Sequence, residues 1–217
     1  MSNEIGLKEL SNIILGAVDA IHQNHEQLSQ LDTVVGDGDH GITMLRAMNN
    51  ARTAVDNYNG SDLKGLLSDV GWGLLSVDGG ATGPLFGSFF MGMSEALTDQ
   101  KTVDGPLLAS AFEAGLAQLS KQTTAKPGDK TMIDAVVPAV KAIREAADAG
   151  DPPLEMLAKG CTAALQGAIA TKQYRAKFGR AKNQGDRTIG AQDPGATSAA
   201  FILQGMHDGL MKVSEHG

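Results

Sequence analysis

The segment LSNIILGAVDAI (residues 10–21) places apolar side chains at Leu10, Ile13, Ile14, Ala17, Val18 and Ile21. Spacings of three and four residues put these side chains on one face of an α-helix, so the segment predicts a long amphipathic helix over about residues 4–27. Seven further segments repeat the pattern, around residues 45–55, 63–74, 85–97, 107–119, 133–143, 154–169 and 201–213. No segment reads as a convincing strand. We therefore expect an all-α fold with eight helices.

The length and composition of the chain indicate a single domain over residues 1–217. This length allows one well-buried core but is short for two full domains. Apolar residues make up 42% and charged residues 20%, and no stretch is long and apolar enough to span a bilayer. The first residues lack the pattern of a secretory signal, and the single cysteine, Cys161, fits a reducing compartment. A cytoplasmic protein with no membrane partner is expected.

The net charge of −7 argues against a nucleic-acid partner, because neutralising phosphates requires a basic surface. Residues 171–187 depart from this acidic balance. Against Asp186 alone, they carry Lys172, Arg175, Lys177, Arg180, Lys182 and Arg187. The segment is either a solvated basic loop or a site for a phosphate or an acidic partner.

Four of the connections between the expected helices are rich in glycine and aspartate. They are GDGDHG (36–41), VDGGATGP (77–84), KPGDKT (126–131) and the long stretch 178–195, which ends in QDPG. These connections follow the first, third, fifth and seventh helices. If consecutive helices pack antiparallel, as short connections imply, all four emerge at the same end of the molecule. We therefore expect the four loops to face one another.

The first of these loops contains a candidate metal site. Asp37 and Asp39 are two residues apart, so an extended backbone would point both carboxylates the same way, and Asp32 lies close enough to join them. Carboxylates without histidine or cysteine ligands suit a hard cation such as Mg²⁺. Beside a triphosphate, more than one divalent ion is needed to approach neutrality. The alternative interpretation is that these aspartates cap a helix in a turn.

The other loops suit phosphate groups. The glycine-rich loop 79–84 ends in Pro84, a favoured first residue of a helix, and Pro194 opens the last helix in the same way. Backbone N–H groups and the helix dipole at such a start can hold phosphate oxygens, although each loop alone is more often a tight turn. No Walker motif occurs. The basic segment could offer Arg180 or Arg187 to a transferring phosphoryl group.

Together these motifs resemble the nucleotide-binding L subunit of dihydroxyacetone kinase. The matching stretches are residues 31–32, 36–41, 79–87, 126–132, 179–181 and 189–196, in the same order and over nearly the whole chain. The resemblance implies an antiparallel up-and-down barrel of eight helices, with a nucleotide, ADP or ATP, and two Mg²⁺ ions at one end. Asp78 before the glycines and residues 182–188 depart from the family pattern.

The resemblance also assigns roles to individual residues. It implies that the metal ligands are Asp32, Asp37 and Asp39. It implies that the phosphates meet His40, Gly79, Gly80, Ala81, Thr82 and Gly83, and that the nucleotide is bordered by Met132, Arg180, Asp193 and Pro194. The catalytic roles fall to His40 and Arg180.

The expected activity is transfer of the γ-phosphoryl group of bound ATP to dihydroxyacetone or another short ketose. By the resemblance, a separate K-type subunit holds the ketose, and a phosphotransferase-system protein or exchangeable ATP supplies the phosphoryl group. A homodimer is an open alternative for the assembly. Two other functions also stay open: a noncatalytic regulatory carrier of a nucleotide or lipid, and a stand-alone magnesium-dependent phosphohydrolase.

Overall fold

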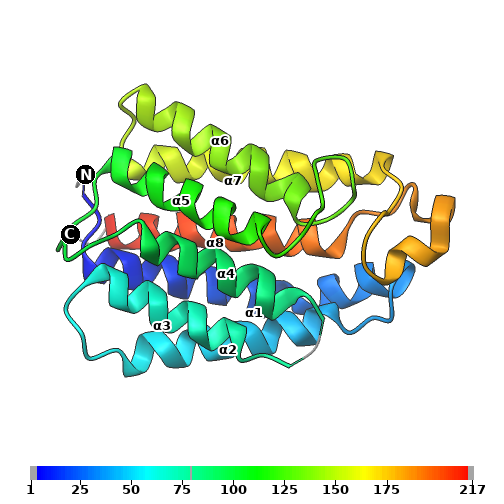
Figure 1. Ribbon diagram of the computed structural model, residues 1–217, viewed down its shortest axis with the longest axis horizontal. Coiled ribbons are helices and arrows are strands. Elements are labelled where there is room, and N and C mark those ends of the chain that lie inside the picture. The colour runs from blue at the N-terminus through cyan, green and yellow to red at the C-terminus, as the bar shows by residue number, and fades with distance from the viewer. Residues whose placement is uncertain (1–3, 79, 215–217) are drawn as a thin grey trace.

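The computed structural model describes residues 4–78 and 80–214, and this part of the chain contains eight α-helices and no β-strand (Figure 1). The helices are α1 (Leu7–Val35), α2 (His40–Asn57), α3 (Leu63–Leu75), α4 (Thr82–Glu95), α5 (Gly105–Ser120), α6 (Ile133–Asp148), α7 (Pro153–Ala170) and α8 (Pro194–Ser214). Two 3₁₀ segments, η1 (Thr171–Gln173) and η2 (Arg180–Thr188), lie between α7 and α8. The expected all-α class is confirmed.

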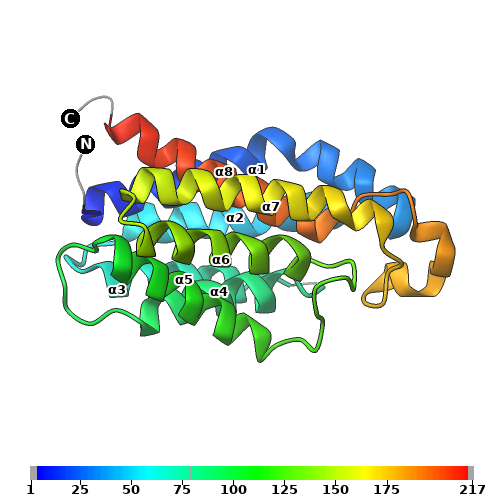
Figure 2. The ribbon, with the colours of Figure 1, turned by 90° about the horizontal axis from the view of Figure 1, so that it is seen from above.

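The helices form a closed ring. Each helix packs against the next one in the chain, and α8 packs against α1, so the eight helices make an antiparallel up-and-down barrel (Figures 1 and 2). The four connections after α1, α3, α5 and α7 all lie at one end, on the right of Figure 1. The termini of the described chain lie at the other end. The expected meeting of the four loops at one end is therefore what the structure shows.

Glycines allow the first and last helices to approach closely. A Cβ atom added to Gly16 of α1 would lie 2.1 Å from the carbonyl oxygen of Gly205 on α8. One added to Gly205 would lie 2.2 Å from the carbonyl oxygen of Gly16, and one added to Gly209 would lie 2.1 Å from that of Asn12. No side chain fits in these spaces without moving the backbone. We call this close contact of α1 and α8 the glycine seam, and it closes the ring of helices.

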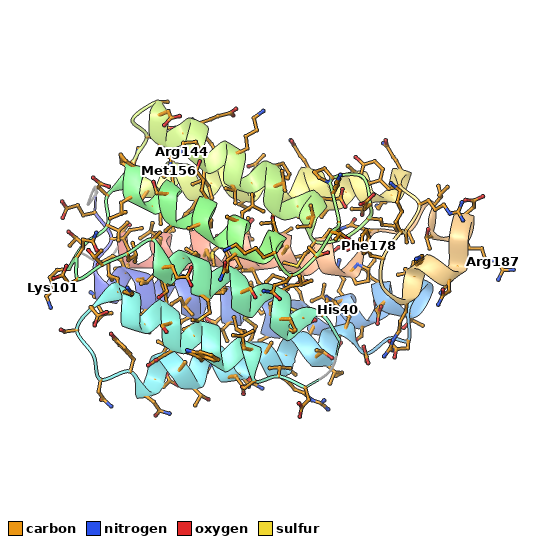
Figure 3. All side chains as sticks on the ribbon, in the orientation of Figure 1. His40, Lys101, Arg144, Met156, Phe178 and Arg187 are labelled. Atoms are coloured by element: carbon orange, nitrogen blue, oxygen red, sulfur yellow. The ribbon has the colours of Figure 1, made fainter. Side chains whose placement is uncertain are left out.

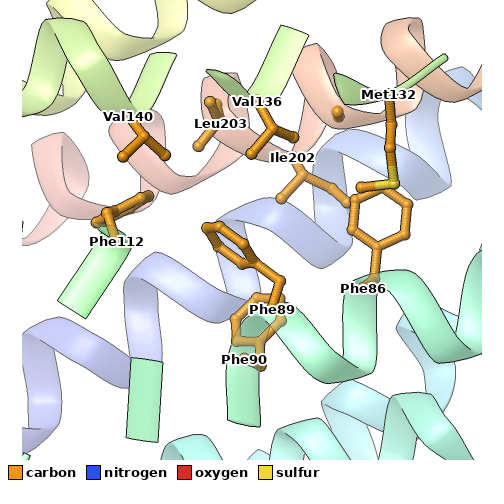
Figure 4. A pocket seen from close by; sticks show the side chains of 10 residues that line it. Phe86, Phe89, Phe90, Phe112, Met132, Val136, Val140, Ile202 and Leu203 are labelled. Carbon is orange, nitrogen blue, oxygen red and sulfur yellow. The ribbon is translucent and has the colours of Figure 1, made fainter. Parts of the chain in front are cut away.

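The interior of the barrel is filled with apolar side chains. Phe89 packs edge-to-face on Phe90 and Phe112, with ring centroids 6.0 and 5.9 Å away. The cavity that remains beside these rings has about 20 Å³ of free space, and its lining is apolar (Figure 4). Such a space is about the size of one water molecule. Within the described residues, no helix is long and apolar enough to cross a membrane.

Two helix boundaries differ from the sequence-based expectation. Helix α1 continues to Val35 instead of ending near residue 27, so Asp32 lies on its last turn. Its final turns continue the apolar spacing at Leu28, Leu31 and Val35, and the side chains of Leu28 and Val35 are buried. Helix α4 begins at Thr82, so Pro84 is its third residue and not its first. Both differences bring polar residues onto helices at the loop-rich end.

Candidate functional site

Three carboxylates lie together where α1 ends and α2 begins. Asp32, Asp37 and Asp39 each offer one oxygen atom, and these atoms lie within 4.8 Å of one another. Asp32 is partly buried, whereas Asp37 and Asp39 are exposed. We call these three residues the carboxylate cluster. Its oxygen-only donors and spacing fit a hard divalent cation.

The backbone at the carboxylate cluster is a tight turn and not the extended backbone expected from the sequence. Gly38 has φ of +82°, a left-handed conformation that glycine adopts without steric cost, and Asp39 has helical dihedral angles. Asp39 occupies the N-cap position of α2, but its side chain makes no capping hydrogen bond. Asp32 accepts the N–H of His40 instead, at 3.2 Å. Helix capping therefore does not explain why the carboxylates of Asp37 and Asp39 lie at this position.

Arg180 contacts the carboxylate cluster from the segment between α7 and α8. Its Nη1 atom makes an ion pair with Asp37 and lies 3.7 Å from Asp39 Oδ2. The side chains of all three residues are exposed to solvent by 43% or more. Arg180 belongs to η2, which leaves the end of the barrel and reaches back to the last turns of α1 (Figure 1). The guanidinium neutralises part of the negative charge of the cluster.

His40 connects the carboxylate cluster to α8. It is the first residue of α2, and its Nε2 atom lies 3.1 Å from the hydroxyl oxygen of Ser198 on α8. Loss of hydration lowers the pKa of His40, while Asp32 and the backbone of Pro194 oppose this effect. The imidazole is therefore neutral at neutral pH. Sequence reasoning missed Ser198, which carries no motif signal because its partner is far away in the chain.

The start of α8 is buried and fully hydrogen-bonded. Asp193 is the N-cap: its Oδ2 accepts the N–H of Ala196 at 2.7 Å, and its own N–H donates to Thr171 Oγ1 at 2.9 Å. Only 8% of Asp193 is exposed, and burial raises the pKa of its carboxyl to about 7. Pro194 and Met132 are also buried. These residues form the floor of the loop-rich end.

The glycine-rich loop before α4 lies at the same end of the barrel (Figure 1). Gly79 lies outside the described residues. Gly80 has φ of +64° and open space around it, and Ala81 is exposed. Thr82 and Gly83 are buried, and a Cβ atom on Gly83 would lie 2.9 Å from the carbonyl oxygen of Leu74. Gly80 and Ala81 are thus accessible to a ligand, whereas Gly83 serves the packing of α4 on α3.

Four helices begin at this end: α2, α4, α6 and α8. Their N-termini direct partial positive charge toward the same region, where anionic groups are stabilised. Figure 3 shows His40 at this end, with Phe178 and Arg187 in the neighbouring segment between α7 and α8. The side chain of Arg187 is exposed and points away from the barrel. Of the two arginines considered from sequence, Arg180 is the one at the carboxylate cluster.

The loop before α6 is shaped by acidic side chains. Asp134 accepts the N–H groups of Gly128 and Thr131, the latter at 2.8 Å. Asp129 accepts the N–H of Lys126 at 2.8 Å and the ammonium of Lys177 at 2.6 Å, which lowers the pKa of Asp129. These contacts fix the loop next to the segment between α7 and α8. Sequence reasoning did not single out Asp134.

Comparison with known proteins identifies relatives over nearly the whole chain. Residues 34–208 match the DAK2 domain family. The chain is 39% identical to the ADP-binding subunit of PEP-dependent dihydroxyacetone kinase 1 from Listeria innocua, over 86% of this chain and 88% of the relative. It is 34% identical to the ADP-binding subunit of the Escherichia coli PEP-dependent dihydroxyacetone kinase, over 90% of this chain and 93% of the relative.

A solved structure shares the fold. The dihydroxyacetone kinase from C. freundii, in complex with AMP-PNP and Mg²⁺, superposes with a TM-score of 0.72 at 26% sequence identity. The match covers 92% of this chain but only 33% of that chain. The present chain therefore corresponds to about one third of the C. freundii enzyme.

Proposed function

Because this chain belongs to the DAK2 domain family, we propose that it is the nucleotide-binding phosphotransfer subunit of a kinase for dihydroxyacetone or a similarly short ketose. The observation that carries the proposal is the contact of Arg180 with Asp37 in the carboxylate cluster. This contact joins a candidate phosphate-binding cation, a candidate metal site and four helix N-termini at one end of the barrel. The names of the Listeria innocua and Escherichia coli relatives support ADP as the nucleotide.

The residues at this end fit a magnesium nucleotide. Asp32, Asp37 and Asp39 would hold Mg²⁺, and three carboxylates beside a polyphosphate support two ions. Bound Mg²⁺ would neutralise the phosphate oxygens and polarise the transferring phosphoryl group. Gly80 and Ala81 offer an accessible backbone at the start of α4 for the phosphates.

Arg180 is well placed to change partners during the reaction. Its side chain is 64% exposed, and it contacts the carboxylates that would bind the metal ions. Cations on Asp37 and Asp39 would compete with the guanidinium and release its N–H donors. These donors would then be free for the transferring phosphoryl group, where an arginine stabilises the charge that develops. His40, neutral and held between Asp32 and Ser198, would hydrogen-bond a phosphate oxygen without adding charge.

The acceptor ketose is assigned to a separate subunit in this proposal. The C. freundii enzyme is about three times as long as this chain, which leaves room there for a second module that binds the ketose. We infer that this chain works with a K-type subunit and that a phosphotransferase-system protein recharges the bound nucleotide. A lipid carrier is less well supported, since the cavity of about 20 Å³ would have to enlarge greatly to hold an acyl chain.

A reconstitution assay tests the proposal. The purified chain is mixed with a K-type subunit, dihydroxyacetone or erythrulose, and either Mg-ATP or a phosphorylated carrier protein, and sugar phosphate is measured by mass spectrometry. We expect product only when the subunit, a ketose and one phosphoryl donor are all present. Product without the K-type subunit would contradict the subunit assignment. Tight nucleotide binding with no transfer to any ketose would favour the regulatory carrier.

A further inference from the structure

Lys130 has two features that are unusual for a lysine. Only 2% of the residue is exposed, although lysine is almost never fully buried unless its charge is paired. Its φ is +62°, and among residues 4–78 and 80–214 it is the only non-glycine residue with a positive φ. A side chain with a Cβ atom is strained in this conformation. The loop thus accepts a strained backbone that carries the lysine side chain inward.

The ammonium of Lys130 bonds to both ends of residues 171–193, which we call the α7–α8 segment. It donates to the carbonyl oxygen of Thr171 at 2.6 Å and also to that of Ala191. Thr171 directly follows α7, and Ala191 lies just before α8. Two further bonds join the same ends: Asp193 N–H to Thr171 Oγ1 at 2.9 Å, and Gly190 N–H to Lys172 O at 2.7 Å. One buried cation therefore sits at the base of the whole segment.

Two buried carboxyl groups influence the ammonium of Lys130. Burial lowers the pKa of Lys130, and the nearby carboxyls of Asp193 and Asp134 oppose this effect in part. Asp134 is only 5% exposed and also accepts the N–H groups of Gly128 and Thr131 from the loop that carries Lys130. Removal of this ammonium would leave the carbonyl groups of Thr171 and Ala191 without their donor, and an unsatisfied polar group at a buried position costs stability.

The α7–α8 segment carries Arg180, which contacts Asp37 in the carboxylate cluster. Its position depends on how the two ends of the segment are held. We propose that Lys130 is a positioning residue: its ammonium locks the base of the α7–α8 segment onto the loop before α6 and so places Arg180 at the carboxylate cluster. The lock should raise the affinity for Mg-ADP, and only this last part rests on the proposed function.

Lys177 provides a matched control. It also joins the α7–α8 segment to the loop before α6, through Asp129, but its side chain is 61% exposed. The Lys177 ammonium stays in contact with solvent, which screens its interaction with Asp129, and the backbone bond from Lys177 N–H to Asp129 O does not depend on the side chain. Lys130→Met and Lys177→Met each remove one ammonium and keep a similar chain length. Their comparison separates the buried lock from a general loss of positive charge.

Two measurements test the lock at a temperature well below the melting temperature of each variant. Hydrogen exchange followed by mass spectrometry reports the opening of residues 171–193, and calorimetry reports the dissociation constant of Mg-ADP. For Lys130→Met we expect exchange in the segment to be faster and Mg-ADP binding to be weaker by roughly tenfold or more, as for a lost charge-assisted bond. Lys177→Met should stay within about twofold of the wild type. Lys130→Arg, which keeps the charge and its donors, should recover part of the affinity.

The outcomes are distinguishable. A folded Lys130→Met variant with wild-type exchange in residues 171–193 and wild-type Mg-ADP affinity would overturn the proposal. If the wild type binds no nucleotide, the proposed function fails, and the exchange comparison still decides on the lock. If Lys130→Met does not fold, hydrogen exchange in the wild-type protein tests the proposal instead. In that case residues 126–132 and 171–193 should open together, and independent opening of the two segments would contradict the lock.

Discussion

Arg180 and Asp37 form an ion pair that joins the α7–α8 segment to the carboxylate cluster. The pair is solvent-exposed, so its own contribution to stability is small. The pair matters because a divalent cation and the guanidinium of Arg180 would compete for the same carboxylate, that of Asp37. Metal binding and the position of Arg180 are therefore linked.

Replacement of Arg180 should have opposite effects on metal binding and on catalysis. Arg180→Gln removes the competing cation, so Mg²⁺ should bind roughly threefold to tenfold more tightly in the absence of nucleotide. The same variant should lose phosphoryl transfer on the order of 10³-fold, as expected for an arginine that stabilises the transferring group. Calorimetry with Mg²⁺ and the reconstituted kinase assay check the two effects. Weaker Mg²⁺ binding in the variant would contradict the competition.

Arg187 offers a control within the same segment. Its side chain is exposed and has the same charge, but it points away from the barrel (Figure 3). Arg187→Gln should leave both Mg²⁺ affinity and transfer close to wild type.

The carboxylate cluster should be essential for magnesium-dependent nucleotide binding. Asp37→Asn keeps the shape of the side chain but removes its charge, so the affinity for Mg-ADP should fall by roughly tenfold or more. Asp56→Asn is a suitable control, since Asp56 is an exposed aspartate near the opposite end of α2. Titration of each variant with ADP, with and without Mg²⁺, gives the comparison. Unchanged magnesium dependence in Asp37→Asn would show that the metal assignment is wrong.

The buried carboxyl of Asp193 should make stability depend on pH. Its pKa is raised from 3.8 to about 7, mainly by burial, so the folded state binds the proton more tightly than the unfolded chain does. The contribution of Asp193 to the free energy of unfolding is therefore complete below about pH 4 and is lost as the pH rises toward about 7. Asp193→Asn cannot titrate but retains a good N-cap. Relative to wild type, it should gain stability between these pH values, on the order of a few kcal/mol.

Denaturant unfolding at several pH values measures this difference. Asp104→Asn serves as the control, because Asp104 is also a helix N-cap, with its carboxylate accepting the N–H of Leu107 at 2.9 Å, but it is exposed. The stability of Asp104→Asn relative to wild type should vary much less over the same range. A pH-independent difference for Asp193→Asn would contradict the proton linkage.

The glycine seam between α1 and α8 should be sensitive to a single methyl group. In Gly205→Ala the new Cβ atom meets the backbone of Gly16, so the two helices must move apart. We expect a loss of about 2 kcal/mol in the free energy of unfolding, typical of overpacking. In Gly105→Ala the Cβ atom instead meets the flexible end of the Met156 side chain at 3.1 Å, so the loss should be smaller. Urea denaturation of both variants shows whether Gly205→Ala loses more stability than Gly105→Ala.

The sequence was most informative where the pattern was local. Apolar spacing predicted every helix, and the short distance between Asp37 and Asp39 predicted the carboxylate cluster. The end of α1 was placed too early, although the apolar spacing continues through Leu28, Leu31 and Val35 to the last turn of the helix. Local spacing also suggested an extended backbone around Gly38, whereas a left-handed turn brings the carboxylates together.

Long-range partners could not be predicted. Ser198 contacts His40 across 158 positions of the chain, and Lys130 bonds to carbonyl groups 41 and 61 positions away. Every residue has a backbone carbonyl group, so the residue types in the sequence do not reveal which carbonyl groups accept hydrogen bonds from Lys130. The nearest signal is the motif Gly128-Asp129-Lys130-Thr131, which is only a fragment of the Walker pattern, and its lysine is buried.

The seam between α1 and α8 also has a consequence for synthesis on the ribosome. The ring closes only when the last helix meets the first, which is the contact of greatest chain separation in the barrel. A nascent chain that ends before α8 has the carboxylate cluster but lacks Ser198 and the partner for Gly16. Its open edges are apolar, as in other incomplete folding intermediates. The barrel and its site can therefore be completed only after α8 has been synthesised.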